Sequence, residues 1–191
     1  MTTIPTTTSE SPNSPTLNDA VTEGIVAIQV VQDDPKKYYI HEALLVHHSE
    51  YFRKALSGLW KEATEKYFTL TDVEHTVFNI FVHWLYKQIF PAVEDSPTWS
   101  DIIGVDPDEH GVQDILRLKY EAYSFRDRFL IPASRRGTAK TIVEHIQEYG
   151  LSCWEISEIV DWAWENIPPN RPVLQLLVGK FCDNWEVTED D

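Results

Sequence analysis

The chain has 191 residues, with 16 lysines and arginines against 31 aspartates and glutamates, and a formal net charge of −15 at pH 7. A nucleic-acid interface gathers Lys and Arg to neutralise phosphates, and an anionic membrane surface attracts the same residues. The composition therefore argues against nucleic acid and against a membrane as partners. An acidic excess of this kind most often serves solubility, although it also suits a basic patch on a protein partner.

Residues 1–20 are rich in Thr, Ser and Pro and contain no Lys or Arg. They carry too little apolar surface to offset the entropy of ordering, so we expect them to be disordered. They also lack the basic and apolar parts of a secretory signal, and no apolar run approaches the ~18 residues of a spanning helix. The only cysteines, Cys153 and Cys182, do not make a disulfide framework. We therefore expect an intracellular protein, cytoplasmic or nuclear.

The first elements are predicted to be a hairpin and a helix. Residues 25–31 are β-branched and predict a strand, and after the turn residues at 33–35 the returning strand is expected at 38–40. An apolar repeat at three and four residues then predicts one helix across 44–56. Gly58 follows it, in the place where a glycine takes the left-handed conformation after a helix.

A short strand at Tyr67–Leu70 and a helix along the apolar stripe 77–86 come next. Thr71 and Glu74 have the spacing of a capping box ahead of that helix. Residues 91–111 then break the pattern, with prolines, glycines, six acidic residues and no Lys or Arg. They predict an acidic surface loop with a short helical turn around 99–103.

The rest of the chain is predicted to be helical. Apolar repeats place helices within 115–129, 142–149 and 156–167, each followed by a proline or a glycine. A last helix has Pro172 in its first turn. Its expected buried face is Leu174, Leu177, Val178, Phe181 and Trp185. Two strands, a helix, a strand and then helices indicate an α+β fold. We expect one domain over residues 21–185, followed by an acidic tail at 186–191.

Several short motifs occur in one family's order and spacing. They are Tyr39-Ile40-His41, Leu44-Leu45, Ser49-Glu50-Tyr51-Phe52, Trp84-Leu85-Tyr86 and the run from Tyr123 to Pro132. Together they resemble a BTB/POZ domain, particularly that of stand-alone fungal BTB proteins. The resemblance covers residues 23–185 and is strongest over 38–86. It implies a BTB/POZ fold, a small β-sheet flanked by a helical cluster with additional C-terminal helices. It also implies a protein–protein interaction module, an adaptor or scaffold, and not an enzyme.

The sequence departs from the family at a few positions. Gly24 stands where the family often has Asp, and Glu42 stands where a basic residue usually follows the His. A charged pocket that depends on that pair is therefore not expected. Strongly dimerising BTB domains often carry an amphipathic helix before the first strand, and the Thr/Ser/Pro-rich segment here shows no such stripe. A homodimer remains possible, and a monomer is as well supported.

One motif points to a partner. In BTB proteins, cullin-3 binding commonly uses a hydrophobic-x-Glu step after the paired-leucine helix, and Trp60-Lys61-Glu62 fits that step. The resemblance thus implies a partner-binding surface of Leu59, Trp60 and Glu62 and recruitment of a substrate to a cullin-3 ubiquitin ligase. Two alternatives stay open. Trp60 could pack on the core with Glu62 solvated, or the protein could be a self-associating or transcription-linked scaffold without a ligase role.

Catalytic and metal-binding motifs are missing from the sequence. It has no Gly-x-Ser-x-Gly elbow and no phosphate-binding glycine loop. His47 and His48 are adjacent, so on a helix they diverge by about 100° and do not share an ion easily. Neither cysteine belongs to a Cys-x-x-Cys pair. We expect no metal and no cofactor, and an enzyme is the remote alternative.

Seven tryptophans are many for this length, and two of them are two residues apart. Trp162 and Trp164 on one helix point about 200° apart. At least one of them is therefore expected outside the main apolar stripe. An exposed tryptophan there would mark a second contact surface.

Overall fold

The computed structural model describes residues 22, 24–32, 34–58, 60–91, 96–103, 107–150 and 153–186. Its side chains are described over the same ranges except at 96–97, 103, 107–114, 153–155 and 184–186. The predictions of a disordered segment at 1–20 and of a tail after 186 therefore fall outside the described residues. Over the described ranges, no helix combines the length and the apolar character needed to cross a membrane.

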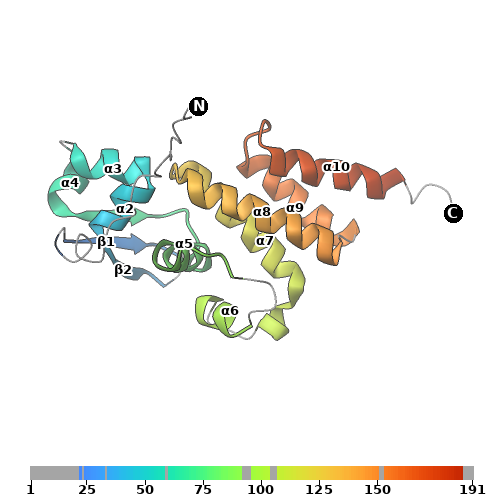
Figure 1. Ribbon diagram of the computed structural model, residues 1–191, viewed down its shortest axis with the longest axis horizontal. Helices are drawn as coiled ribbons and strands as arrows, with labels where there is room; N and C mark the ends of the chain where they lie inside the picture. The colour runs from blue at the N-terminus through green and yellow to red at the C-terminus, as the bar shows by residue number, and fades with distance from the viewer. Residues whose placement is uncertain are drawn as a thin grey trace, which may run out of the picture.

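A three-stranded sheet forms one end of the molecule (Figure 1). Strand β1 (Ile25–Val30) lies in the middle, antiparallel to β2 (Lys36–His41) and parallel to β3 (Tyr67–Leu70). The predicted hairpin and the short third strand are confirmed. Side chains alternate between the two faces of a strand, and one face of β1 is fully buried. Its inward residues are Val26, Ile28 and Val30.

The first helical segment is broken, so the prediction of one helix across 44–56 is wrong. Helices α2 (Glu42–His48) and α3 (Glu50–Ser57) are separated at Ser49, whose backbone is extended at φ −124° and ψ 119°. The Ser49 hydroxyl accepts a hydrogen bond of 3.1 Å from the backbone N–H of Phe52 and so caps α3. The apolar repeat continues across this break, which hides it from a periodicity argument.

Helix α4 (Lys61–Glu65) leads into β3, and α5 (His75–Lys87) follows the sheet. The predicted capping box at Thr71 and Glu74 is wrong, because Glu74 is itself the N-cap of α5 and its side chain makes no capping bond. The first backbone N–H of α5, on His75, instead donates to the side-chain oxygen of Gln32 at 3.1 Å. The start of α5 is thus held by the connection between β1 and β2.

The predicted acidic loop at 91–111 is wrong in most of its secondary structure, although the expected helical turn around 99–103 lies within a helix. Helix α6 (Ser96–Ile103) and the first turns of α7 (Pro107–Arg128) occupy most of it. Pro97 and Pro107 lie at helix starts, where the missing N–H of proline costs nothing. The side chain of Trp99 is fully buried, packed with its neighbours in a small apolar cluster. The acidic and proline-rich composition therefore marks helix N-termini here.

Three more helices complete the chain: α8 (Pro132–Tyr149), α9 (Cys153–Asn166) and α10 (Pro172–Glu186). The predicted helices are confirmed, although α8 begins well before its apolar stripe. On the expected face of α10, Leu174 and Leu177 are buried, and Val178 and Phe181 are half-buried. The side chain of Trp185 lies outside the described part.

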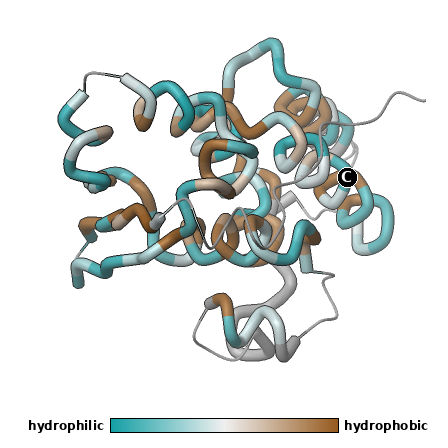
Figure 2. Tube along the Cα trace, turned by 60° about the vertical axis from the view of Figure 1, so that its left-hand side comes forward, coloured by the Kyte–Doolittle hydropathy of each residue, from teal (hydrophilic) through white to brown (hydrophobic). Residues whose placement is uncertain are grey.

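Helix α7 connects the two ends of the molecule. Phe125 in α7 and Phe129 just after it belong to the apolar cluster of the sheet, α2, α3 and α5, whereas Tyr120 and Tyr123 belong to the cluster of the C-terminal helices. Figure 1 shows the sheet and α3 at one end and α8–α10 at the other, and Figure 2 shows apolar stretches recurring along the helices between polar ones. A helix shared by both clusters fixes the surfaces of the two ends relative to each other.

Candidate protein-binding surfaces

The corner between α3 and α4 presents Trp60 to solvent. Its side chain is 69% exposed, and the residue is the N-cap of α4. Glu62 lies in the first turn of that helix and is half-buried. Leu59 falls outside the described residues. The indole of Trp60 is therefore not part of the core, and Glu62 follows it two residues later in the first turn of α4.

Gly58 sets the position of the Trp60 indole. Its φ of −92° is not left-handed, so the predicted reason for a glycine here is wrong. A Cβ added at Gly58 would lie 2.6 Å from Cδ1 of Trp60. No real Cβ makes so short a contact, which means that the ring packs directly over the Gly58 backbone. The glycine is needed for this close approach.

The charges around this corner are mostly local pairs. Lys61 and Glu65 lie 3.5 Å apart on α4, and Lys54 and Glu50 lie 2.7 Å apart on α3. Such exposed pairs contribute little to stability. Glu62 takes part in no ion pair among the described residues. Its carboxylate therefore has room for a basic group from outside.

Gly24 and Glu42, two of the positions that depart from the family pattern, lie close to each other. The backbone N–H of Glu42 donates to the carbonyl of Gly24 at 3.1 Å, and Gly24 has a positive φ of 92° that glycine adopts without strain. The Glu42 carboxylate pairs with Nζ of Lys66 at 2.6 Å. An acidic residue after His41 is thus matched by a lysine at the start of β3.

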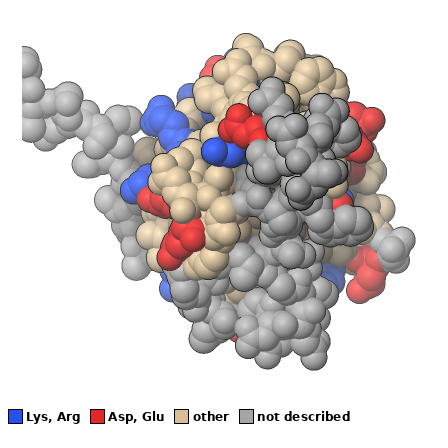
Figure 3. Space-filling model, turned by 90° about the vertical axis from the view of Figure 1, so that its right-hand side faces the viewer, with Lys and Arg blue, Asp and Glu red and all other residues tan. Residues whose placement is uncertain are grey.

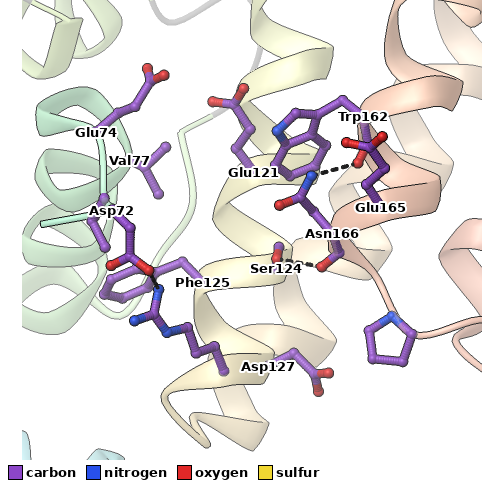
Figure 4. Close-up of a pocket in the computed structure, with 13 residues that line it drawn as sticks. Asp72, Glu74, Val77, Glu121, Ser124, Phe125, Asp127, Trp162, Glu165 and Asn166 are labelled. Carbon is purple, nitrogen blue, oxygen red and sulfur yellow. Dashed lines mark hydrogen bonds and ion pairs between the residues drawn. The ribbon is translucent and has the colours of Figure 1, made fainter. Parts of the chain in front are cut away.

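A cavity of about 500 Å³ opens between the connection from β3 to α5 and the helices α7 and α9. Figure 4 shows Asp72 and Glu74 on one wall and Glu121, Trp162 and Glu165 on the other. We call it the acidic cleft. Its lining residues are Asp72, Val73, Glu74, Val77, Glu121, Ser124, Phe125, Asp127, Arg128, Trp162, Glu165, Asn166 and Pro168.

Three of the five carboxylates of the acidic cleft are paired. Asp72 binds Arg128 at 2.6 Å, Glu121 accepts from Nε of Arg117 at 2.9 Å, and Asp127 lies between two arginines at the far side. Glu74 and Glu165 are exposed and make no ion pair among the described residues.

Glu121 is the most buried of these carboxyls, with 9% of its side chain exposed. Burial raises its pKa, the hydrogen bond from Arg117 lowers it, and the nearby Glu74 raises it again. The pKa of Glu121 lies above its ordinary value because burial and Glu74 outweigh the arginine. Burial is the largest cause of this shift, and the charge of Glu74 adds to it.

The two tryptophans of α9 lie on different sides of the helix, as predicted. Trp162 is half-buried and lines the acidic cleft. Trp164 is 63% exposed. The prediction that at least one of them leaves the apolar stripe is confirmed, and α9 presents an aromatic side chain both to the cleft and to open solvent.

Clusters that could hold a metal ion do not form in the described part of the chain. No three His, Cys, Asp or Glu side chains there lie close enough to hold an ion. His48 packs against Trp84, and burial together with the adjacent His47 lowers its pKa to about 4.

Seen from the side of α8–α10, acidic and basic side chains are interspersed among the described residues (Figure 3).

The cleft residues could not be identified from the sequence alone. Glu74, Glu121 and Glu165 are far apart along the chain and belong to no local motif. The overall excess of acidic residues is the only feature of the sequence that relates to them. Trp60 and Trp162, in contrast, are marked by their spacing in the sequence.

Residues 24–98 of this chain match the family model of the BTB/POZ domain. The match runs from the residue before β1 into α6, so the sheet and α2–α5 are a BTB/POZ domain. The predicted fold class is confirmed: a three-stranded sheet with helices in a BTB/POZ domain and further helices after it. A BTB domain is a protein–protein interaction module without catalytic activity of its own.

Proposed function

We propose that this protein is an adaptor, similar to the fungal BTB proteins, that recruits a target to a cullin-3 ubiquitin ligase through Leu59, Trp60 and Glu62. The observation that carries the proposal is the exposure of Trp60 directly before a short helix that holds Glu62. Exposed tryptophans are frequent anchors of protein interfaces. The proposed setting is intracellular, in the cytoplasm or the nucleus.

The corner has the properties of an interface anchor. A tryptophan buries roughly 150–250 Å² when a partner covers it, and its N–H gives the contact a direction. Packing over Gly58 holds the ring in place before binding, which lowers the entropy that association costs. The Glu62 carboxylate, in the first turn of the helix that Trp60 caps, favours a basic group on the partner.

Binding of purified cullin-3 tests the proposal. Trp60→Ala should weaken the complex about 30-fold, the effect of losing a central aromatic anchor, and Glu62→Ala about fivefold. Trp164→Ala is the matched control, because Trp164 is comparably exposed but lies on α9. If wild-type protein recovers no cullin-3, or if Trp164→Ala weakens the complex as much as Trp60→Ala, the ligase role at this corner is wrong.

A self-associating or transcription-linked scaffold without a ligase role is the second candidate. Ile25 and Tyr39 favour it, since they are 56% and 68% exposed on the same outer face of the sheet. An exposed apolar sheet face is suited to a second copy of the chain. Light scattering of wild type against Tyr39→Lys separates the candidates. A concentration-dependent dimer that Tyr39→Lys dissolves would support the scaffold.

A further inference from the structure

The acidic cleft is built from two parts of the chain. Asp72, Glu74 and Val77 come from the matched BTB segment, and Glu121, Trp162 and Glu165 come from the helices that follow it (Figure 4). Neither part forms the cavity alone. The hydrogen bond from the Ser124 hydroxyl to the carbonyl of Asn166, at 2.9 Å, holds α7 and α9 together at its floor.

The chemistry of this cavity suits a cation. Glu74 and Glu165 are unpaired carboxylates on opposite walls, and between them the buried Glu121 accepts only one described hydrogen bond, through one carboxylate oxygen. A positive group placed there would relieve the repulsion between these charges. Because the cleft is partly shielded from water, such a pair is stronger than one on an open surface.

Trp162 adds an aromatic wall to these charges. Its side chain lines the cavity, on the same helix as Glu165. A Lys or Arg side chain over an indole face gains a cation–π attraction beyond simple charge pairing. Aliphatic portions of the same side chain would contact Val77 and Phe125. The combination selects a long cationic side chain over a small ion.

The undescribed segments of the given sequence do not supply this cation. All 16 lysines and arginines of the chain belong to residues whose side chains are described, and every undescribed segment is without Lys and Arg. The segments 1–21 and 187–191 therefore have no basic side chain to place in the cleft. Among the described cations, Arg128 reaches the cleft lining and is paired with Asp72.

We propose that the acidic cleft binds a lysine- or arginine-bearing segment of a protein partner, with one cationic side chain between Glu74 and Glu165 and against Trp162. The inference rests on the proposed adaptor function and deepens it, since it gives the chemistry of a second partner besides cullin-3. The target would dock on the surface shared by the BTB segment and α9, whose lining does not include Trp60.

Fluorescence anisotropy with a defined peptide tests the proposal on the full chain. The probe is a short fluorescein-labelled peptide in which Lys and Arg alternate with Gly. Glu74→Gln/Glu165→Gln should weaken its binding about five- to tenfold. The matched control is Glu144→Gln/Glu148→Gln, which removes the same charge from exposed positions of α8 outside the cleft lining. It should change the affinity less than about twofold, because exposed charges at a distance are screened.

Trp162→Leu separates a formed site from general attraction to an acidic protein, because it leaves the net charge unchanged. It should weaken peptide binding about fivefold, the lower range of a partly desolvated cation–π contact, and Trp162→Phe should restore most of the affinity. Circular dichroism checks that both variants stay folded. Equal loss in the two double variants, with no effect of Trp162→Leu, would overturn the proposal.

Two further results keep the cleft distinct from the cullin-3 corner. Trp60→Ala should bind the basic peptide as wild type does, and Glu74→Gln/Glu165→Gln should bind cullin-3 as wild type does. If the protein does not bind cullin-3, the proposed binding of a basic segment in the acidic cleft is therefore not contradicted. If the cleft variants instead dissolve a dimer seen by light scattering, a second copy occupies the cleft and the proposal is wrong.

Discussion

The hydroxyl of Ser49 donates a hydrogen bond of 2.7 Å to the carbonyl of Phe129, which lies 80 residues further along the chain. The same oxygen accepts the capping bond from Phe52, so one buried side chain both starts α3 and ties it to the end of α7. The adjacent backbone N–H of Glu50 donates to the carbonyl of Leu130 at 3.3 Å. These hydrogen bonds join the BTB segment to the end of α7, in addition to the Arg128–Asp72 ion pair and the packing of Phe125 and Phe129.

Removing the Ser49 hydroxyl should lower the stability of the fold. Ser49→Ala removes the N-cap of α3 and leaves the Phe129 carbonyl without its side-chain donor. We expect the free energy of unfolding to fall by about 2 kcal/mol, the sum of a lost cap and a buried acceptor. Urea unfolding measures it. Ser57→Ala, at an exposed serine with a weak 3.5 Å bond, is the control and should change stability by less than about 0.5 kcal/mol.

Gly58→Ala should affect the corner without altering its charge. The added Cβ would collide with the Trp60 ring and force it to a new position. We expect cullin-3 affinity to fall about tenfold, through loss of the preformed anchor. Gly137→Ala is the control, because nothing lies near a Cβ there and alanine suits its helix. Wild-type affinity of Gly58→Ala would show that the position of the ring is unimportant.

Arg126 is a buried cation without a counter-charge in the described part of the chain. Its side chain is fully buried, only its Nε has a hydrogen bond, to Ser134, and burial lowers its pKa to about 9. The guanidinium lies 5.3 Å from the centre of the Phe90 ring, but replacing buried charged groups with well-packed apolar residues of similar volume is often neutral or stabilising. Arg126→Met/Ser134→Ala should therefore raise the free energy of unfolding by about 1–3 kcal/mol. A loss of that size in thermal or urea unfolding would mean that the buried guanidinium stabilises the fold.

His48 should make stability depend on pH. Burial, and then the neighbouring His47, hold its pKa near 4, below the ordinary value of 6.5. The unfolded chain therefore binds this proton at a higher pH than the folded protein does. The contribution of His48 to the free energy of unfolding is fully present above pH 6.5 and is lost as the pH falls towards 4.

The size of the effect is on the order of 1 kcal/mol, because His48 is half-buried and solvent reduces it. His48→Gln should flatten the unfolding free energy measured between pH 7 and pH 4. Parallel curves for the two proteins would show that another group causes the slope.

The sequence correctly predicts the strands and helices that bury one continuous apolar face. The β-branched run at β1 and the apolar repeats of α9 and α10 lie where the sequence places them, because each buries one continuous face. The break at Ser49 was missed because the apolar repeat is in phase on both sides of it. The helices α6 and α7 were missed at their starts, since proline is read as a breaker but is well accommodated in a first helical turn.

The two candidate sites also differ in how far the sequence alone predicts them. Trp60 and Glu62 belong to a short motif, so the sequence marks them, but the exposure of the ring and its contact with Gly58 are properties of the folded chain. The acidic cleft depends on packing α7 and α9 against the connection before α5. No periodicity along the chain encodes that arrangement, because the residues that meet there belong to separate elements.

The match to the BTB model ends at residue 98, but the apolar cluster of the sheet does not end there. Phe129 stacks on Phe52 with ring centroids 5.5 Å apart, and Phe125 lies 5.1 Å from Phe81. A fragment cut after residue 98 would expose both partner rings and leave the Ser49 hydroxyl without its acceptor. The smallest independently folding piece of this protein therefore extends at least to Ile131, the last residue of that cluster.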